Sequence, residues 1–482
     1  MAVCNGKQYI DRINGLKTNI WIDGKPIHGI ISEHLAFKGV ISSQARLYDL
    51  QHNNELKDLM TFKSPVTGDL VGTSFLEPKT KDDLEKRRLM IQEWAKETAG
   101  MMGRTPDYMN TVLMVLNAAS TLFSFQDQKC AENFRAYFEY VRENDLSLTH
   151  VFVKPQTNRA QNNNNNNNNE EGIISARMID KTADGIIIKG ARILATQAGM
   201  TDEILVYPVG SHIVDESFAY AFAIPCNTPG LKFLCREAYI KGDSNYNNPL
   251  GTRFEEMDAI VVFDNVLVPW DRVFLHGNII ANSFLYDQSS FIEHVGHQIV
   301  SKNIIKTEFM LGVIQLIIDT INIGKFQHVQ EKLSEVVIAL ETLKGFVCSA
   351  EMGAKVDQWG TMTPDPNPIL AAINYYPRIY PRFSEIIQLL GASGLIALPS
   401  ENDFKSPIKS ELDHYLQSFD RNGQERVKLF RLAWDIGMSS FGSRQTLYER
   451  FFFGDPVRLA ETLYNQYDRT HAIHLAQSFL SE

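Results

Sequence analysis

The sequence has few cysteines, no excess of basic residues and no long hydrophobic run. Its five cysteines are scattered over 482 residues, which is typical of reduced thiols rather than of a disulfide framework. The net charge of -10 argues against a nucleic-acid-binding protein, which needs a basic face. No stretch approaches the roughly 18 apolar residues of a membrane span, and the N-terminus has no apolar signal core. We therefore expect a cytoplasmic protein with no nucleic-acid or membrane partner.

Several common cofactor and metal motifs are also absent. The chain has no G-x-G-x-x-G behind a strand, no G-x-x-x-x-G-K-[ST] and no H-E-x-x-H, so neither a Rossmann nicotinamide site nor nucleotide hydrolysis nor zinc proteolysis is indicated. His294 and His297 are three residues apart on an expected helix and could share one face. Without nearby cysteine or carboxylate support, such a pair is more typical of helix packing than of a metal site. We expect no bound metal.

Helical patterns occupy both ends of the chain. A chain of this length should form two or three subdomains. Residues 1–149 are expected to be mostly helical, and residues 283–482 should form a bundle of long amphipathic helices. The helices with the clearest apolar periodicity are expected at 81–98, 108–125, 131–143, 302–323, 326–355 and 425–453.

The middle of the chain, residues 150–282, has the pattern of a β domain. Short β-branched runs at 173–179, 185–189, 203–207, 218–224 and 259–263 are separated by Gly, Asp or Pro. Short strands without interleaved helices predict an antiparallel barrel or sandwich. Eight consecutive asparagines, Asn162 to Asn169, lie in this part, and such a polar tract predicts a disordered loop tip.

The first candidate for chemistry is the run Gly103-Arg104-Thr105-Pro106-Asp107-Tyr108. Thr105 followed by Pro106 predicts a helix start with a hydroxyl cap. Arg104 would then lie just outside the helix N-terminus, where free amides and the helix dipole favour an anion. Tyr108 falls in the first turn. A cation, a phenol group and free amides together predict an oxyanion pocket, although a capped surface helix with a solvated arginine would have the same local sequence.

Other segments, read together with this run, resemble a known family. They are His150 with Pro155-Gln156, the run Gly190 to Thr196, Leu390 to Gly394, Asp403 to Pro407 and Tyr448 to Pro456. The chain resembles, nearly end to end, the oxygenase components of two-component, reduced-flavin-dependent 4-hydroxyphenylacetate 3-monooxygenases. That resemblance implies an α+β, acyl-CoA dehydrogenase-like fold with an N-terminal helical domain (1–149), a β-barrel (150–282) and a C-terminal helical bundle (283–482), assembled as a homotetramer.

The resemblance also implies roles for individual residues. Arg104, Tyr108 and His150 match residues that hold the phenol hydroxyl and take part in catalysis. The implied contacts of flavin, with FAD expected, are His150, Val151, Phe152, Gln156, Thr157, Asn158, Arg159, Thr196, Gly442, Ser443, Arg444 and Gln445. Pro208 and Val209 stand where relatives can have small hydroxyl residues that contact the acid tail of the substrate.

The implied activity is hydroxylation of a phenol ortho to its hydroxyl group, through a flavin hydroperoxide formed from O₂ and reduced flavin that a separate reductase supplies. The attack needs positive charge beside the phenol oxygen; Arg104 would supply it, and His150 could exchange a proton near neutral pH.

Three alternatives remain at the level of the sequence. The substrate could be a different phenol, such as a chlorophenol or nitrophenol. A related hydroxyacyl-CoA dehydratase with an iron–sulfur cluster would need several cysteines near one histidine, and the segment around Met101 to Arg104 offers none. A flavin-free helical scaffold would bind no reduced FAD.

Overall fold

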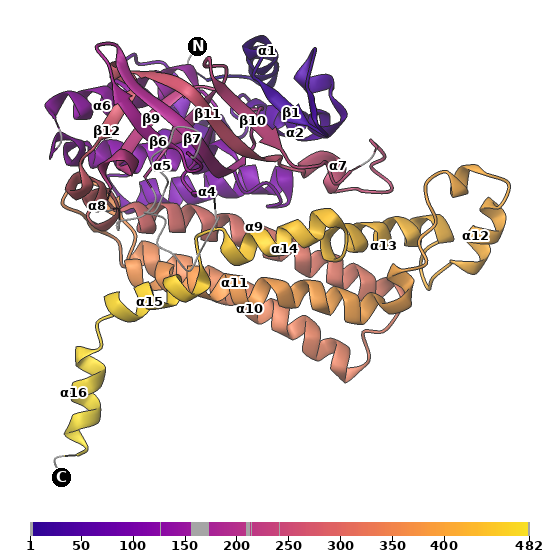
Figure 1. Cartoon of the computed structure of the whole chain (residues 1–482). Helices are drawn as coiled ribbons and strands as arrows, with labels where there is room; N and C mark the ends of the chain where they lie inside the picture. Colours follow the sequence, from indigo (N-terminus) through magenta and orange to yellow (C-terminus); the bar gives the residue numbers. More distant parts are fainter. Residues whose placement is uncertain are drawn as a thin grey trace.

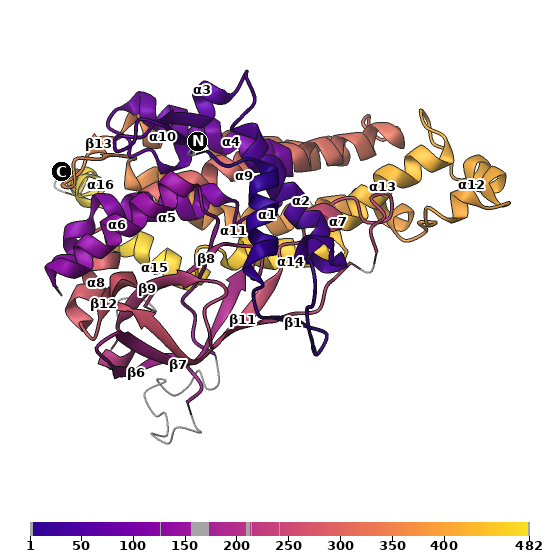
Figure 2. The same ribbon diagram turned by 90° about the horizontal axis from the view of Figure 1, so that it is seen from above.

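The computed structural model has two sheets packed beside a bundle of long helices (Figures 1 and 2). It describes residues 3–125, 127–155, 173–208, 213, 215–240 and 242–480. Gln156, Thr157, Asn158, Arg159, Val209 and the asparagine tract lie outside these residues, so the predictions made for them stay predictions.

The N-terminal part is mostly helical, as predicted. Its helices are α1 (Gly6–Leu16), α2 (Leu35–Leu50), α3 (Lys57–Met60), α4 (Lys81–Thr98), α5 (Pro106–Ala118) and α6 (Gln128–Asn144). Helix α4 has the predicted bounds because Thr80 caps it: the Thr80 side chain accepts from the Asp83 amide, and the Asp83 side chain accepts in return from the Thr80 amide. The predicted helix at 108–125 ends earlier, and a 3₁₀ turn at Ser120–Phe125 follows it.

This part also contributes strands that the sequence pattern did not predict. Two short hairpins are formed by β1 (Ile20–Ile22) with β2 (Lys25–Pro26) and by β3 (Thr61–Lys63) with β4 (Leu70–Gly72). Strand β1 pairs in parallel with β10 (Leu231–Cys235), so the N-terminal segment extends the central sheet.

The middle of the chain forms two sheets. The six-stranded sheet has the order β2-β1-β10-β11-β7-β6, and the four-stranded sheet has the order β12-β9-β8-β5. Their remaining strands are β5 (Leu148–Val151), β6 (Arg177–Lys181), β7 (Gly185–Thr196), β8 (Glu203–Val206), β9 (Tyr220–Pro225), β11 (Asp258–Pro269) and β12 (Val273–His276).

Most strand pairs are antiparallel, as predicted, but β1–β10 and β5–β8 are parallel. Neither sheet closes on itself among the described residues, so closure into a barrel stays a prediction. Strands β7 and β11 run longer than their sequence patterns because they pair with each other along nearly their whole length. The short helix α7 (Gly251–Phe254) precedes β11.

The C-terminal part is helical, as predicted. Its helices are α8 (Ile279–Asp287), α9 (Phe291–Thr320), α10 (Gln327–Met352), α11 (Pro366–Gly391), α12 (Lys409–Tyr415), α13 (Gly423–Gly437), α14 (Ser440–Phe451), α15 (Pro456–Gln466) and α16 (Thr470–Ser478), with a small hairpin of β13 (Lys355–Val356) and β14 (Met362–Thr363). The helix predicted over 425–453 is two helices, because Ser439 ends one and its hydroxyl oxygen accepts from the Gly442 amide at the start of the next.

One large hydrophobic core joins the six-stranded sheet to α9, α10 and α11, and a second joins α5 and α6 to the four-stranded sheet. The long helices α9 and α14 run beneath the sheets in Figure 1. Among the described residues, no helix combines the length and apolar character needed to cross a bilayer.

Candidate active site

Arg104 lies at the start of α5, where the sequence placed it, but it is buried rather than solvated. Its side chain is only 8% exposed. The guanidinium carbon is 4.2 Å from the ring centre of Tyr108 and 4.0 Å from that of Phe452, so two aromatic rings enclose it. Its Nε and Nη1 atoms have no hydrogen-bond partner among the described residues. A buried cation in this state is available to an anionic or partly anionic ligand.

The main-chain amides of Gly103 and Arg104, which precede the cap residue of α5, are not free. The Gly103 amide donates to Glu256 Oε2 (3.0 Å) and the Arg104 amide donates to Glu256 Oε1 (2.8 Å). Thr105 occupies the cap position, but its side chain makes no capping hydrogen bond. Gly103 has no room for a side chain, because a Cβ atom there would lie 2.0 Å from the Tyr448 hydroxyl oxygen. In the turn before α5, the guanidinium is therefore available to a ligand, whereas the amides of Gly103 and Arg104 are not.

Tyr108 and His150 line a cavity of about 250 Å³. The His150 ring centre is 5.6 Å from that of Tyr108 and 5.5 Å from that of Phe152, with which it is stacked. Apart from Tyr108, His150, Tyr207 and Thr462, the described side chains around this cavity are apolar. Such a cavity suits an aromatic molecule whose polar end is held at one wall.

His150 is buried, and its Nδ1 atom has no partner among the described residues. Burial, and then the nearby charge of Arg104, lower the pKa of His150 well below its ordinary value. This shift favours the neutral imidazole at pH 7. A neutral imidazole can accept a hydrogen bond from a phenol hydroxyl.

A second cavity, of about 680 Å³, adjoins the first. Three side chains line both cavities and form the wall between them: His150, Phe152 and Phe452. The larger cavity lies between strands β7, β10 and β11 and helix α14, and Arg104 and Thr196 also line it. Five of its apolar residues are unusually exposed for their type: Phe152, Leu194, Ile260, Leu447 and Phe451. Exposed apolar side chains at a cavity mark a surface that a ligand or partner covers.

Asp258 organises the polar side of the larger cavity. Arg444 makes two hydrogen bonds to it, at 2.8 and 2.7 Å, and Arg236 makes a third at 3.0 Å. Burial would raise the pKa of Asp258, but Arg444 and then Arg236 hold it at about 2. Thr196 donates its hydroxyl proton to Asp258 (2.8 Å). The oxygen of Thr196 can therefore accept a hydrogen bond from a ligand in the cavity.

The other predicted flavin contacts are distributed unevenly. Phe152 and Arg444 line the larger cavity, whereas Val151 packs in the main hydrophobic core. Gly442, Ser443 and Gln445 do not line it: Ser443 is exposed, and the Gln445 side chain donates to the Met101 carbonyl (2.9 Å). Pro208 is buried and does not line the smaller cavity. Flavin contacts at Val151, Gly442, Ser443 and Gln445, and a substrate contact at Pro208, stay predictions.

Sequence reasoning missed several residues around Arg104. Glu256 and Asp258 are buried acids in the charge-rich run Arg253 to Asp258, which carries no local signal of burial. Behind Phe452 lies a second charged cluster, in which Lys302 and Lys306 donate to Glu449 at 3.1 and 2.7 Å. Burial, partly offset by Glu449, lowers the pKa of Lys306 to about 8. These groups come from α9 and α14, so only the fold brings them together.

The two histidines of α9 have ordinary packing partners. The ring of His294 contacts the Thr363 hydroxyl (3.1 Å), and His297 contacts Glu351 (2.9 Å). The described residues contain no group of three or more His, Cys, Asp or Glu arranged to hold a metal ion.

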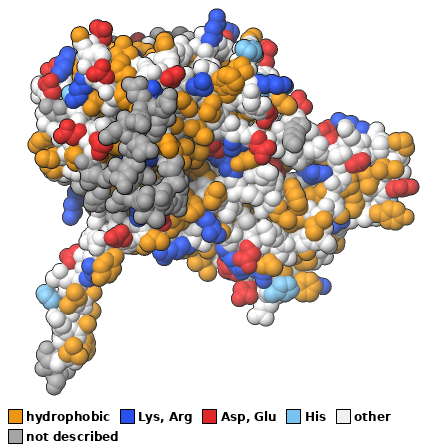
Figure 3. All heavy atoms as spheres, in the orientation of Figure 1, with side chains coloured by type: hydrophobic (Ala, Val, Ile, Leu, Met, Phe, Trp, Pro, Cys, Tyr) orange, Lys and Arg blue, Asp and Glu red, His pale blue; other side chains and the backbone are white. Residues whose placement is uncertain are grey.

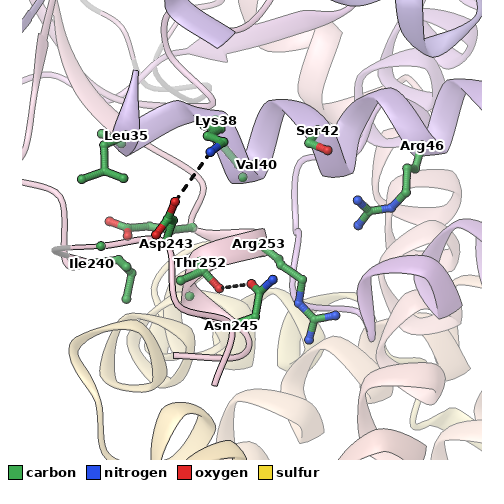
Figure 4. A pocket seen from close by; sticks show the side chains of 15 residues that line it. Leu35, Lys38, Val40, Ser42, Arg46, Ile240, Asp243, Asn245, Thr252 and Arg253 are labelled. Carbon is green, nitrogen blue, oxygen red and sulfur yellow. Dashed lines mark hydrogen bonds and ion pairs between the residues drawn. The ribbon is translucent and has the colours of Figure 1, made fainter. Parts of the chain in front are cut away.

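A third cavity, of about 270 Å³, lies between α2 and the segment around α7 (Figure 4). The close-up shows Lys38 paired with Asp243 and Thr252 bonded to Asn245, with the Arg253 side chain directed away from both pairs. None of the residues that the sequence singled out lines this cavity.

Comparison with known protein families matches residues 5–275 to the N-terminal part of 4-hydroxyphenylacetate 3-hydroxylase and residues 282–481 to its C-terminal part. The chain belongs to the 4-hydroxyphenylacetate 3-hydroxylase family. A probable 4-hydroxyphenylacetate 3-monooxygenase of Bacillus subtilis is 49% identical to it, over 100% of this chain and 99% of the relative. The oxygenase component of the Geobacillus enzyme is 46% identical, over 100% of this chain and 97% of the relative.

Solved structures agree with this membership of the 4-hydroxyphenylacetate 3-hydroxylase family. The crystal structure of an oxygenase component of 4-hydroxyphenylacetate 3-monooxygenase in complex with FAD and 4-hydroxyphenylacetate is 42% identical, with a TM-score of 0.94 over 99% of this chain and 98% of that one. An archaeal 4-hydroxybutyryl-CoA dehydratase is 18% identical, with a TM-score of 0.88 over 99% of this chain and 95% of that one, which shows that it shares the fold.

Proposed function

We propose that this protein is the oxygenase component of a two-component monooxygenase, which uses reduced FAD and O₂ to hydroxylate a phenol ortho to its hydroxyl group. The observation that carries the proposal is the buried Arg104 guanidinium, free of any carboxylate partner among the described residues. It lines the larger cavity and contacts Tyr108 and Phe452, which line the smaller one. The 4-hydroxyphenylacetate found in the related crystal structure is the first substrate to test.

The residues of the larger cavity fit a flavin. Its volume, its exposed apolar rim and the hydroxyl oxygen of Thr196 suit a flat heterocycle with one hydrogen-bond donor at its edge. Bound reduced flavin would supply, with O₂, the electrophilic oxygen that the phenol ring attacks. Thr196, backed by Asp258, would orient the ring edge, and Phe152 with Phe452 would separate it from bulk water on the side of the smaller cavity.

The phenol would lie in the smaller cavity with its oxygen toward Arg104 and His150. Neutral His150 would accept a hydrogen bond from the phenol hydroxyl, and the guanidinium would stabilise the negative charge that develops on the phenol oxygen. Electron density from that oxygen makes the ortho carbon more nucleophilic. The apolar lining holds the rest of the ring and excludes water.

A phenol with an uncharged para substituent is the second candidate substrate. The described lining of the smaller cavity contains no lysine or arginine that could pair with an acid tail. A relative from Rhodococcus that is 29% identical over 93% of this chain is a 4-nitrophenol 2-monooxygenase.

The decisive experiment supplies reduced FAD from a separate flavin reductase and measures catechol and hydrogen peroxide per O₂ consumed. We expect hydroxylation only when the reductase or chemically reduced FAD is present, because the sequence has no nicotinamide motif. Strong NADH oxidation by the isolated chain, or the absence of any hydroxylated phenol, would contradict the proposal.

We further infer a homotetramer in the cytoplasm. The C-terminal helix α16 projects from the body of the molecule and carries exposed hydrophobic side chains (Figures 1 and 3), with Ile473 50%, Leu475 58% and Phe479 75% exposed. A nine-residue helix with no buried residue is unstable alone in water, so contact with another subunit would stabilise it. All five cysteines are free thiols, as expected in a reducing compartment. Light scattering of the purified protein tests the tetramer.

A further inference from the structure

Glu256 connects three parts of the candidate active site. It is fully buried, two residues before β11. Its two oxygens accept the amides of Gly103 and Arg104, at 3.0 and 2.8 Å. It also accepts from the side chain of Gln197, the neighbour of Thr196, at 3.1 Å. Its fourth contact is with Arg444, at 3.7 Å. One carboxylate therefore joins the turn that carries Arg104 to the residues that line the larger cavity.

The carboxylate of Glu256 bonds to the main chain of Arg104, and no contact joins it to the Arg104 guanidinium among the described residues. If the carboxylate paired with the guanidinium instead, the positive charge would be neutralised before a ligand arrived. Because both oxygens are held by the two amides, the turn is fixed and the guanidinium remains between Tyr108 and Phe452.

We propose that Glu256 is a positioning residue of the hydroxylation site, whose carboxylate holds the amides of Gly103 and Arg104 and thereby keeps the Arg104 guanidinium in the larger cavity, against the rings of Tyr108 and Phe452. This inference rests on the proposed function, since it assigns to that guanidinium the task of stabilising a phenolate.

Replacement by glutamine tests the two oxygens separately from the volume of the side chain. Glu256→Gln keeps the size, but the amide has one oxygen acceptor and one NH₂ donor. One of the two main-chain amides would then face a donor, and the turn would lose that hydrogen bond. The substitution also removes a negative charge, which by itself would favour ionisation of a phenol bound nearby. Positioning and simple charge therefore predict opposite changes.

The probe is 4-nitrophenol bound to the full-length protein in the presence of FAD, because its ionised form is distinguished by its absorbance. We expect Glu256→Gln to lower the ionised fraction of the bound probe at fixed pH, although the variant has lost a negative charge. In turnover, we expect catechol formed per O₂ to fall roughly tenfold while peroxide rises, in line with the loss of one hydrogen bond to a charged group. Coupling is the amount of catechol formed per O₂ consumed. An unchanged or increased ionised fraction, together with wild-type coupling, would overturn the inference.

The matched control is Glu255→Gln. Glu255 is also buried and also bonds to an arginine and to one main-chain amide, at Arg236 and Tyr239, but it makes no contact with the Arg104 turn. We expect this variant to keep the ionised fraction and the coupling of the wild-type protein. Equal losses in both variants would show that burial of a carboxylate here serves only general stability, and would overturn the inference.

Two further measurements keep the test decisive. If Glu256→Gln does not fold, Glu256→Asp retains the charge with a shorter reach, and we expect the same loss of ionised probe and of coupling; wild-type values in this variant overturn the inference.

In an Arg104→Met background, Glu256→Gln should cause no further loss of coupling, and an additive loss would overturn the inference. If the wild-type protein hydroxylates no phenol at all, the proposed function is wrong. If the wild-type protein and the Glu256 variant form equal amounts of catechol per O₂ consumed, only the inference is wrong.

Discussion

Arg104 and Arg444 are two buried arginines on the same cavity, and they are held in opposite ways. Arg444 makes a bidentate ion pair with Asp258, at 2.8 and 2.7 Å. Arg104 has two aromatic rings packed against its guanidinium and no carboxylate bonded to it among the described residues. A paired charge contributes to the folded structure, whereas a buried unpaired charge costs stability and is retained for a ligand. The comparison predicts that the first arginine matters for stability and the second for chemistry.

The largest expected effect follows from breaking the paired arginine. Asp258→Asn leaves Arg444 and Arg236 without their shared carboxylate. We expect a loss of about 3–5 kcal/mol in the free energy of unfolding, measured by urea denaturation, because removing one partner of a buried pair leaves an uncompensated charge. Asp264→Asn, at an exposed position of the same strand, should change stability by less than about 0.5 kcal/mol. Equal stability of the two variants would contradict this reading of Asp258.

The next effect concerns the unpaired arginine. Arg104→Met should lower hydroxylation roughly 10²–10³-fold, as for the loss of one oxyanion donor, while oxygen use continues and peroxide replaces the catechol. We expect little loss of melting temperature, because the wild-type guanidinium gains no ion pair from burial. Arg450→Met, an exposed position on α14, is the control. Full coupling in Arg104→Met would show that the phenol does not bind at this helix start.

The pairing of Asp258 also predicts a pH dependence. Its pKa is lowered to about 2 in the folded protein, so its contribution to stability is fully present above the unfolded value of about 3.9 and is lost as the pH falls toward 2. The contribution amounts to about 2 kcal/mol. The stability difference between the wild-type protein and Asp258→Asn should therefore shrink by about this amount between pH 5 and pH 2. A difference that stays constant over this range would exclude the lowered pKa.

The smallest expected effect is at Thr196, whose hydroxyl donates a hydrogen bond to Asp258 in the larger cavity. Thr196→Val removes one hydroxyl, and we expect the peroxide formed per O₂ to rise by roughly threefold to tenfold, the range for one hydrogen bond of about 1 kcal/mol. Thr196→Ser keeps the hydroxyl and should restore coupling. If the serine variant uncouples as much as valine does, then the methyl group and not the hydroxyl is the important part.

The sequence predicted the order of helical and β segments because hydrophobic periodicity is a local property. The bounds of α4 followed from an apolar stripe that lies within the segment itself. It did not predict β1 in the central sheet, because a three-residue strand has almost no pattern of its own and its pairing with β10 joins residues about 210 positions apart. The break between α13 and α14 was missed because a serine cap inside an apolar repeat is a weak signal.

The sequence also determined which residue types stand at the candidate site: an arginine before a helix start, a tyrosine one turn on, and a histidine on the strand β5. Only the tertiary structure decided their state. Glu256 accepts the amides of Gly103 and Arg104 in the turn before α5. Burial and the charge of Arg104 lower the pKa of His150, and Phe452 adds a second ring against the guanidinium. These effects depend on distance and on exclusion of water between segments far apart in the chain, and such quantities have no local signature in an amino-acid sequence.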